Sequence, residues 1–153
     1  IDGLELDATY KPSDTLTLSA YMVSNDPSLS QDYYDVSGVL QANAGNRLAY
    51  VPELSYVLGL DKVLTIAGRS GYFSLDYSYT GERYTSQANT LKLPSYAIAN
   101  MRIGVEMDNS LMEIYLTNLT DENGYQSRYD DFGDIRRTQN RPRVVGLRFK
   151  YRY

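Results

Sequence analysis

Histidine, cysteine and tryptophan are absent from the 153 residues of the chain. Without histidine and cysteine, the sequence lacks the usual general bases, thiol nucleophiles and soft metal ligands. We therefore predict that the chain is not an enzyme, with no catalytic residue, no metal site and no cofactor. The formal net charge of −4 also provides no basic surface for nucleic acid, which we do not expect as a partner.

Long apolar runs are missing too, and no stretch approaches the length that a transmembrane helix needs. Apolar and polar residues alternate instead, while helical periodicity is weak everywhere. Alternation of this kind predicts antiparallel strands with one apolar and one polar face. The expected strands cover residues 4–11, 16–22, 53–61, 73–80, 99–106, 112–117 and 145–153.

The connections between these strands alternate in length. Residues 12–14 and 108–110 are short, and 62–70 form a medium connection. Long polar connections, expected to lack regular structure, cover 25–49, 82–95 and 118–141. Short turns at one end and long loops at the other describe an up-and-down sheet, the arrangement of outer-membrane β-barrels.

Strand length favours a lipid environment over a soluble core. About 10–11 residues at roughly 3.3 Å each, tilted in the bilayer, span the roughly 25 Å apolar band of a membrane barrel. The polar face carries full charges at mid-strand, among them Arg102, Glu113 and Arg148, which we interpret as a charge ladder inside a barrel rather than a catalytic set. Aromatic girdles at the two membrane interfaces are expected from five tyrosines: Tyr10, Tyr50, Tyr84, Tyr96 and Tyr153.

The strand count predicts an incomplete barrel. Bacterial single-chain barrels have even numbers of strands, and lipid tolerates no open sheet edge. We therefore expect residues 1–153 to be about seven C-terminal strands of a larger antiparallel transmembrane β-barrel.

Five segments together resemble the C-terminal barrel region of TonB-dependent outer-membrane receptors. These are 3–12 (GLELDATYKP), 79–84 (YTGERY), 93–96 (LPSY), 118–121 (NLTD) and 142–153 (PRVVGLRFKYRY). Each segment alone is a weak signal, but all five follow the order of the family. Thr120 departs from the pattern, which usually has an aromatic residue there.

The resemblance implies a 22-stranded barrel with an N-terminal plug in its lumen. It also implies import of a scarce nutrient, a ferric siderophore before cobalamin, haem or a glycan, driven by the TonB complex. The expected partners are outer-membrane lipid, the plug and barrel strands absent from this chain, the TonB complex and the outer-membrane assembly machinery. The expected location is the bacterial cell outer membrane, with long loops extracellular and the C-terminus periplasmic.

Two groups of residues are candidates for specific roles. Ligand binding by the long loops is assigned to Tyr33, Tyr34, Arg128, Asp130, Asp131, Arg136 and Arg137. Arginine grips anionic groups and tyrosine stacks on rings, although a divalent-cation site or a solvated, charge-balanced loop remains an alternative. The resemblance implies a barrel-assembly signal in the last strand at Gly146, Phe149, Tyr151 and Tyr153.

Other functions fit parts of the pattern. A passive porin or another barrel without TonB coupling would share the strands and girdles. An outer-membrane hydrolase would need its histidine from strands outside this chain. A soluble β-barrel that binds an apolar ligand would show the same alternation with its faces reversed, but it would not need strands of this length.

Overall fold

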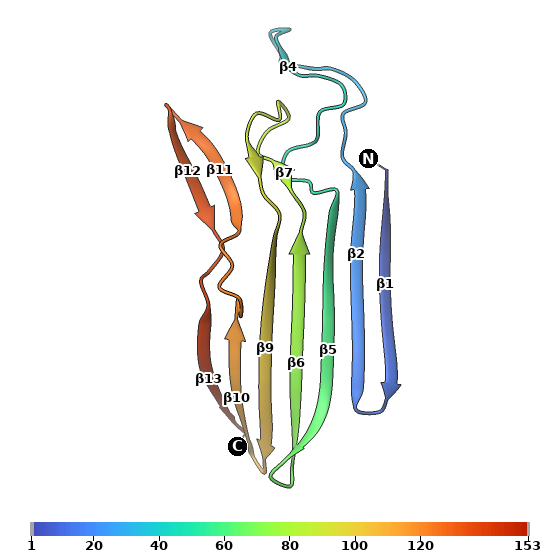
Figure 1. The fold of residues 1–153 in the computed structure, drawn as a ribbon, viewed down its shortest axis with the longest axis vertical. Helices are drawn as coiled ribbons and strands as arrows, with labels where there is room; N and C mark the ends of the chain where they lie inside the picture. Colours follow the sequence, from blue (N-terminus) through green and yellow to red (C-terminus); the bar gives the residue numbers. More distant parts are fainter. Residues whose placement is uncertain (1, 153) are drawn as a thin grey trace.

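One open antiparallel sheet forms most of the fold. The computed structural model describes residues 2–152, without the side chain of Asp131. The seven long strands are β1 (Asp2–Ser13), β2 (Leu16–Asp26), β5 (Leu54–Ile66), β6 (Arg69–Thr80), β9 (Tyr96–Met107), β10 (Ser110–Thr117) and β13 (Val144–Tyr151). They lie side by side in the order β1-β2-β5-β6-β9-β10-β13 (Figure 1). The predicted all-β, up-and-down sheet is confirmed, and β1 and β13 are its two open edges.

Short turns join the long strands at one end of the sheet, called the turn end here. The sequence predicts a connection over 62–70, and this prediction is wrong, because β5 continues to Ile66 and β6 begins at Arg69. Only Ala67 and Gly68 connect them, both with positive φ (51° and 76°). Such a turn matches the right-handed twist of the two strands it joins.

Lys62 explains why the sequence pattern does not predict the last residues of β5. It occupies an apolar-face position between Leu16 and Phe73 on the neighbouring strands and so interrupts the alternation. Its Nζ donates to Thr15 Oγ1 at 2.8 Å. The ammonium group thereby reaches a polar turn while its carbon stem lies along the sheet.

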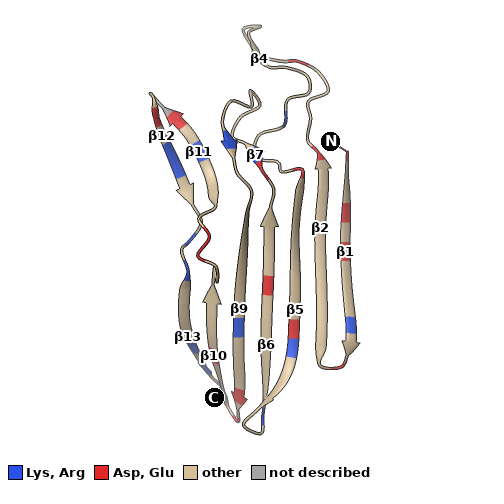
Figure 2. Cartoon of the chain, in the orientation of Figure 1, with Lys and Arg blue, Asp and Glu red and all other residues tan. Residues whose placement is uncertain are grey.

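Three small hairpins stand at the opposite end, the loop end (Figure 1). They are β3 (Tyr33–Tyr34) with β4 (Leu40–Ala42), β7 (Arg83–Tyr84) with β8 (Lys92–Leu93), and β11 (Tyr125–Asp131) with β12 (Asp134–Gln139). The long connections therefore lie where the sequence predicts them, but each contains a hairpin that was not expected. Figure 2 shows that charged residues are sparse along much of the sheet and frequent in these connections.

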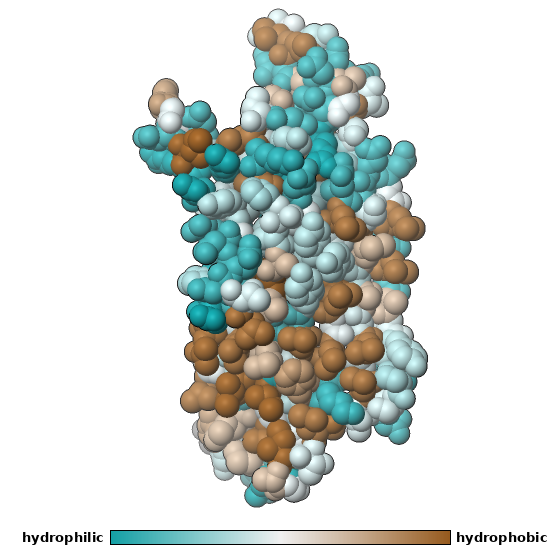
Figure 3. Space-filling model, in the orientation of Figure 1, coloured by the Kyte–Doolittle hydropathy of each residue, from teal (hydrophilic) through white to brown (hydrophobic). Residues whose placement is uncertain are grey.

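The strand register divides the side chains of the sheet between two faces. The apolar face includes Leu18, Ala20, Leu58, Leu60, Phe73, Leu75, Met101, Ile103, Ile114, Leu116, Leu147 and Phe149. The polar face includes Asp7, Thr17, Ser19, Asp61, Ser74, Asp76, Asn100, Arg102, Glu113 and Arg148. On the face seen in Figure 3, apolar side chains cover much of the lower half of the sheet, whereas hydrophilic ones prevail over the hairpins, with smaller apolar patches among them.

Among the residues that the structure describes, no second layer covers the apolar face of the sheet. Leu58 and Ile114 lie in interior strands, yet they are 47% and 43% exposed. Within residues 2–152, the buried hydrophobic residues are Ala42 and Leu93, both in the loop-end hairpins. A sheet normally buries its apolar face against another element, so a single layer of this kind needs an apolar surrounding.

The aromatic residues near the loop end differ from the predicted girdle. Tyr96 lies opposite Thr80 on the polar face, and its ring packs against Gly124, so its assignment to a lipid-facing girdle is wrong. The apolar face instead carries a stack of Tyr56 with Tyr79 and Tyr77, with ring centroids 5.0 and 6.2 Å apart. The alternation of side chains along β9 explains the position of Tyr96, because Tyr96 and Asn100 are four residues apart and therefore lie on the same, polar face.

Candidate ligand-binding clefts at the loop end

Arg47 holds the first two loop-end hairpins together. Its Nε donates to Glu53 Oε1 at 2.8 Å, and its Nη1 lies 3.4 Å from Glu82 Oε1. Asn89 fixes the backbone of the same residue, since its Oδ1 accepts from Arg47 N at 2.7 Å and its Nδ2 donates to Arg47 O at 2.8 Å. Segment 85–91, which contains Asn89, is therefore placed by several contacts that reinforce one another.

The charges around this junction are balanced. Lys92 Nζ lies 2.7 Å from Glu82 Oε2, and both cations, Arg47 and Lys92, lie within 6.0 Å of the Tyr84 ring centroid. The hydrogen bond from Lys92 is the main cause that lowers the pKa of Glu82, and the hydrogen bond to Glu53 is the main cause that raises the pKa of Arg47. Because Glu82 and Lys92 are about half exposed, solvent screening keeps this pair weak.

Asn118 anchors the third connection. The residue is only 2% exposed and has a positive φ of 52°. Its Nδ2 donates to Glu122 O at 2.9 Å and to Arg141 O at 3.0 Å, while its Oδ1 accepts from Glu122 N at 2.9 Å. The NLTD segment of the sequence thus closes the base of hairpin β11–β12. Asp121 assists by accepting from Arg143 N at 2.8 Å.

A cleft of about 360 Å³ lies between the second and third connections. Its lining residues are Tyr50, Thr85, Ser86, Thr90, Leu91, Arg128, Tyr129 and Asp130. The Arg128 side chain has no ion pair or hydrogen bond within the described part of the chain. Asp130 is partly engaged, because its Oδ1 accepts from Gly133 N at 2.7 Å in the hairpin turn. The cleft therefore offers one unpaired cation among several hydroxyl groups, a combination suited to an oxygen-rich anion.

A second cleft, of about 320 Å³, lies on the other side of segment 85–91. Its lining residues are Tyr33, Asp35, Gln41, Ser86, Gln87 and Ala88. Asp35 accepts from Val39 N at 3.0 Å and Gln41 Nε2 at 2.8 Å, and the Val39 amide is the main cause that lowers the pKa of this carboxyl. Asp35 thus shapes its own loop, while the ring of Tyr33, which is 51% exposed, is open to contact.

The two clefts contain part of the predicted ligand-binding set. Tyr33, Arg128 and Asp130 line them, whereas the Tyr34 hydroxyl donates to Asp32 Oδ2 at 3.4 Å. Arg137 donates to Tyr125 Oη at 2.8 Å. Arg136 and Arg137 lie on β12 and line neither cleft, and the side chain of Asp131 lies outside the described residues.

The sequence does not identify segment 85–91 as part of a binding site, although its residues line both clefts. Ser86 contributes to each of them, with Thr85 and Thr90 in one and Gln87 in the other. Residues of these types are common in loops, so composition alone does not single them out. The hydrogen bonds of Asn89 with the Arg47 backbone, and the one from Asn46 Nδ2 to Gln87 O at 2.8 Å, bring the segment between its neighbours.

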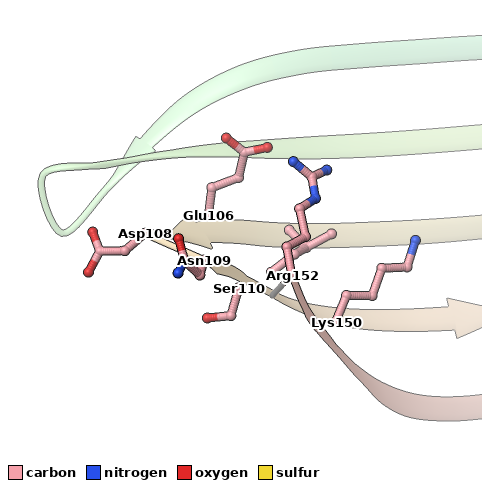
Figure 4. Close-up of a pocket in the computed structure, with 7 residues that line it drawn as sticks. Glu106, Asp108, Asn109, Ser110, Lys150 and Arg152 are labelled. Carbon is pink, nitrogen blue, oxygen red and sulfur yellow. The ribbon is translucent and has the colours of Figure 1, made fainter.

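A smaller recess of about 130 Å³ lies at the turn end. It is lined by Glu106, Asp108, Asn109, Ser110, Leu111, Lys150 and Arg152. Figure 4 shows Glu106, Lys150 and Arg152 extending to the same side of the sheet, while Asp108 points away along the turn. Arg152 N donates to Asn109 O at 2.8 Å, which ties the end of the chain to the β9–β10 turn.

The predicted assembly-signal residues lie on both faces of β13. Phe149 and Tyr151 are 63% and 58% exposed on the apolar face. Gly146 lies on the polar face beneath the ring of Tyr115. Tyr153 lies outside the described residues.

The fold as a whole defines a class of protein, the wall of a transmembrane β-barrel. A single antiparallel layer with long strands, one exposed apolar face and short turns opposite long connections has the features of such walls. No helix within residues 2–152 is long and apolar enough to cross a membrane. In the same residues, no group of three or more acidic, histidine or cysteine side chains could hold a metal ion.

Comparison with protein families gives a particular assignment. The family model described as "TonB dependent receptor-like, beta-barrel" matches residues 1–120, which is well over half of the chain. The chain therefore belongs to the TonB-dependent receptor-like β-barrel family. No curated protein matches the sequence significantly.

Three solved structures share the fold. One is the ferric yersiniabactin uptake receptor FyuA from Yersinia pestis, with 19% sequence identity and a TM-score of 0.80. The other two are from Acinetobacter baumannii. The siderophore receptor PiuA has 20% identity and a TM-score of 0.78, and the ferric preacinetobactin receptor BauA has 20% identity and a TM-score of 0.72. The matches cover 96–97% of this chain. They cover only 21–22% of those receptors, so the chain spans about a fifth of their length.

Proposed function

We propose that the chain is the C-terminal part of the barrel of a TonB-dependent outer-membrane receptor that imports a ferric siderophore. The family match over residues 1–120 carries this proposal. The three structural neighbours are described as receptors for ferric siderophores or siderophores, which favours this ligand class over cobalamin, haem or a glycan. The family consists of transport receptors, which is consistent with a role other than catalysis.

The distribution of charge supports an orientation in the outer membrane. The polar face, with Asp61, Asp76 and Arg102, is assigned to the barrel lumen, and the apolar face to lipid. The loop end is assigned to the extracellular side and the turn end to the periplasm, because outer-membrane barrels have their short turns in the periplasm. The C-terminus, which lies at the turn end, would then be periplasmic (Figure 1).

Energised transport requires parts that this chain does not contain. We assign that role to an N-terminal plug and to the TonB complex that would act on it, as the family implies. The remaining barrel strands would pair with the open edges of β1 and β13. The assembly machinery would act on β13 through Phe149 and Tyr151, together with Gly146 and Tyr153.

Ligand contact by this chain is assigned to the two clefts that flank segment 85–91. Arg128 is the central residue, because its guanidinium is unpaired and can make two parallel hydrogen bonds to a carboxylate or a catecholate. Tyr33 and Tyr129, each 51% exposed, can pack on an aryl group of the ligand. The other predicted ligand residues, Tyr34, Asp131, Arg136 and Arg137, remain candidates for the rim.

The test is iron uptake by the full-length receptor in cells that lack other siderophore receptors. Hydroxamate, catecholate and carboxylate siderophores loaded with radioactive iron, with haem and cobalamin as comparisons, identify the ligand class. For the siderophore that is taken up, Arg128→Gln is expected to raise the apparent Kd roughly tenfold to a hundredfold, as expected for loss of a charge-assisted hydrogen bond. Arg141→Gln, an exposed arginine in the same connection that lines neither cleft, is the matched control.

A passive porin is the competing function, and energy dependence separates the two. An uncoupler or deletion of TonB should abolish accumulation of the iron complex if the proposal holds. Uptake that continues unchanged without the proton-motive force would show a passive pore. Equal affinity of Arg128→Gln and wild type would remove Arg128 from the ligand site without affecting the receptor assignment.

A further inference from the structure

Four polar-face positions form a direct row across the last four long strands, β6, β9, β10 and β13. Tyr72 lies opposite Gly104, and Gly104 lies opposite Glu113. Glu113 lies in turn opposite Arg148. The Tyr72 hydroxyl donates to Glu113 Oε2 across the intervening strand, and Arg148 Nη1 donates to Glu113 Oε1 at 2.7 Å. Both carboxylate oxygens are therefore engaged, and Glu113 is only 3% exposed.

Gly104 makes the contact between Tyr72 and Glu113 sterically possible. A Cβ atom on Gly104 would lie 2.5 Å from Tyr72 Cε1, 2.7 Å from Tyr72 Cζ and 3.0 Å from Tyr72 Oη. The phenol ring thus lies directly over the glycine. Any residue with a side chain at this position would displace the ring and, with it, the hydrogen bond to Glu113.

The adjacent row repeats this arrangement at the last strand. Tyr115 in β10 lies opposite Gly146 in β13, and a Cβ atom on Gly146 would lie 2.7 Å from Tyr115 Cε1. The guanidinium of Arg148 lies 5.4 Å from the centroid of the same ring. Arg148 therefore joins the two rows, because it contacts Glu113 in one and Tyr115 in the other.

The apolar face cannot specify how β10 pairs with β13. Its opposed pairs are Met112 with Phe149, Ile114 with Leu147, and Leu116 with Val145. A shift of β13 by two residues keeps every side chain on its own face and still places apolar residues against apolar residues. Lipid would accept the shifted pairing as readily as the native one, so of the two faces it is the polar face that can discriminate between registers.

On the polar face, a two-residue shift is unfavourable in either direction. One shift places Val144 beneath the Tyr115 ring and Gly146 opposite Glu113, which leaves the carboxylate without Arg148. The other places Lys150 opposite Glu113 but puts the Arg148 backbone position, with its Cβ, beneath the Tyr115 ring. Only the native register gives Tyr115 a glycine and Glu113 an arginine at the same time.

We propose that these polar-face residues form a register lock that selects the pairing of the final strand as the barrel assembles. The lock consists of Tyr72, Gly104, Glu113, Tyr115, Gly146 and Arg148. The pairing register of each strand contributes to the shear of a closed barrel, so an error at β13 would prevent its correct closure. Gly146 contributes to the lock because its lack of a side chain leaves room for the ring of Tyr115, which comes from the neighbouring strand β10. The inference depends on the barrel fold and is independent of the transported ligand.

The test measures strand register in the full-length receptor within its outer membrane. Cysteines at positions 114 and 147 (Ile114→Cys with Leu147→Cys) form a disulfide in the native register, because directly opposed Cα atoms are about 4.5–5.5 Å apart. Ile114→Cys with Phe149→Cys, and Ile114→Cys with Val145→Cys, report the two shifted registers. In the native pairing these diagonal positions are about 7–8 Å apart, too far for efficient disulfide formation.

Two variants disturb the lock in different ways. Gly146→Ala places a methyl group beneath the Tyr115 ring, and Tyr115→Ala removes the ring. Each is expected to raise the ratio of shifted to native disulfide about fivefold, the change that corresponds to a strong cross-strand pair. Gly59→Ala is the matched control, since its Cβ would meet only the side chain of Ser19, which can rotate away.

An unchanged ratio in folded Gly146→Ala and Tyr115→Ala receptors would overturn the proposal. If Gly146→Ala yields no folded barrel, Tyr115→Ala is added to the same receptor. The double variant is expected to recover a heat-modifiable barrel with a raised shifted ratio, because the clash is gone but the selection is lost. Failure of the double variant to assemble would also contradict the lock.

Discussion

Replacing Asn118 with alanine should release hairpin β11–β12 from the sheet. The change removes three side-chain hydrogen bonds, one donated to Glu122 O, one donated to Arg141 O and one accepted from Glu122 N. Each is worth about 1 kcal/mol net. Alanine also tolerates the positive φ of 52° less well than asparagine, which adds about 1 kcal/mol. The local opening free energy should therefore fall by about 3–4 kcal/mol.

Hydrogen–deuterium exchange of the full-length receptor measures this change directly. A loss of about 3–4 kcal/mol corresponds to a roughly hundredfold to thousandfold faster exchange of the Glu122 and Leu119 amides, since 1.4 kcal/mol is about a factor of ten. Asn118→Asp should have an intermediate effect, because it keeps the acceptor for Glu122 N and loses both donors. Asn123→Ala, an exposed asparagine in the same connection, is the control. Equal protection in Asn118→Ala and wild type would refute the anchoring role of Asn118.

Two further predictions concern the loop junction and the apolar face. The hydrogen bond from Lys92 lowers the pKa of Glu82 below its ordinary value of 4.5, so this pair should stabilise the junction above that pH and stop doing so as the pH falls through the lowered value. Exposure limits the effect to less than about 1 kcal/mol, and hydrogen-exchange protection factors of the junction that are higher at pH 3 than at pH 7 would contradict it. Leu58→Arg on the apolar face should destabilise the folded barrel in a bilayer by about 2–4 kcal/mol, whereas Thr17→Arg on the polar face should change its stability little. Equal losses in denaturant titrations of the two variants would show that the faces are assigned wrongly.

The strands could be predicted because lipid imposes a simple rule on them. Every second residue must be apolar, and each backbone group must pair with a neighbouring strand, so alternation alone places most of the sheet. The rule fails at Lys62, where a charged residue occupies an apolar-face position and bonds to Thr15 on the adjacent turn. A contact between residues so far apart in the sequence cannot be recognised from local alternation.

The candidate site could be predicted only in part for a related reason. Arg128 and Tyr33 stand out because charged and aromatic residues in loops suggest ligand contact, and both line clefts. Segment 85–91 has ordinary loop residues, and its position depends on hydrogen bonds between distant residues, two between Asn89 and the Arg47 backbone and one from Asn46 to Gln87 O. Two of the mid-strand charges noted in the sequence, Glu113 and Arg148, pair across neighbouring strands at 2.7 Å. The contacts of Gly104 with the Tyr72 ring and of Gly146 with the Tyr115 ring could not be predicted, because they depend on the strand register.

The most direct test of the membrane-wall assignment is the accessibility of the two ends of the sheet in intact cells. Single cysteines replace Val36, a fully exposed residue at the loop end, and Asn109 in a turn at the turn end of the full-length receptor. A membrane-impermeant maleimide should label Val36→Cys on intact cells, and it should label Asn109→Cys only after the outer membrane is permeabilised. Labelling of Asn109→Cys on intact cells, with Val36→Cys protected, would contradict the proposed orientation, and equal labelling of both would contradict a membrane-spanning wall.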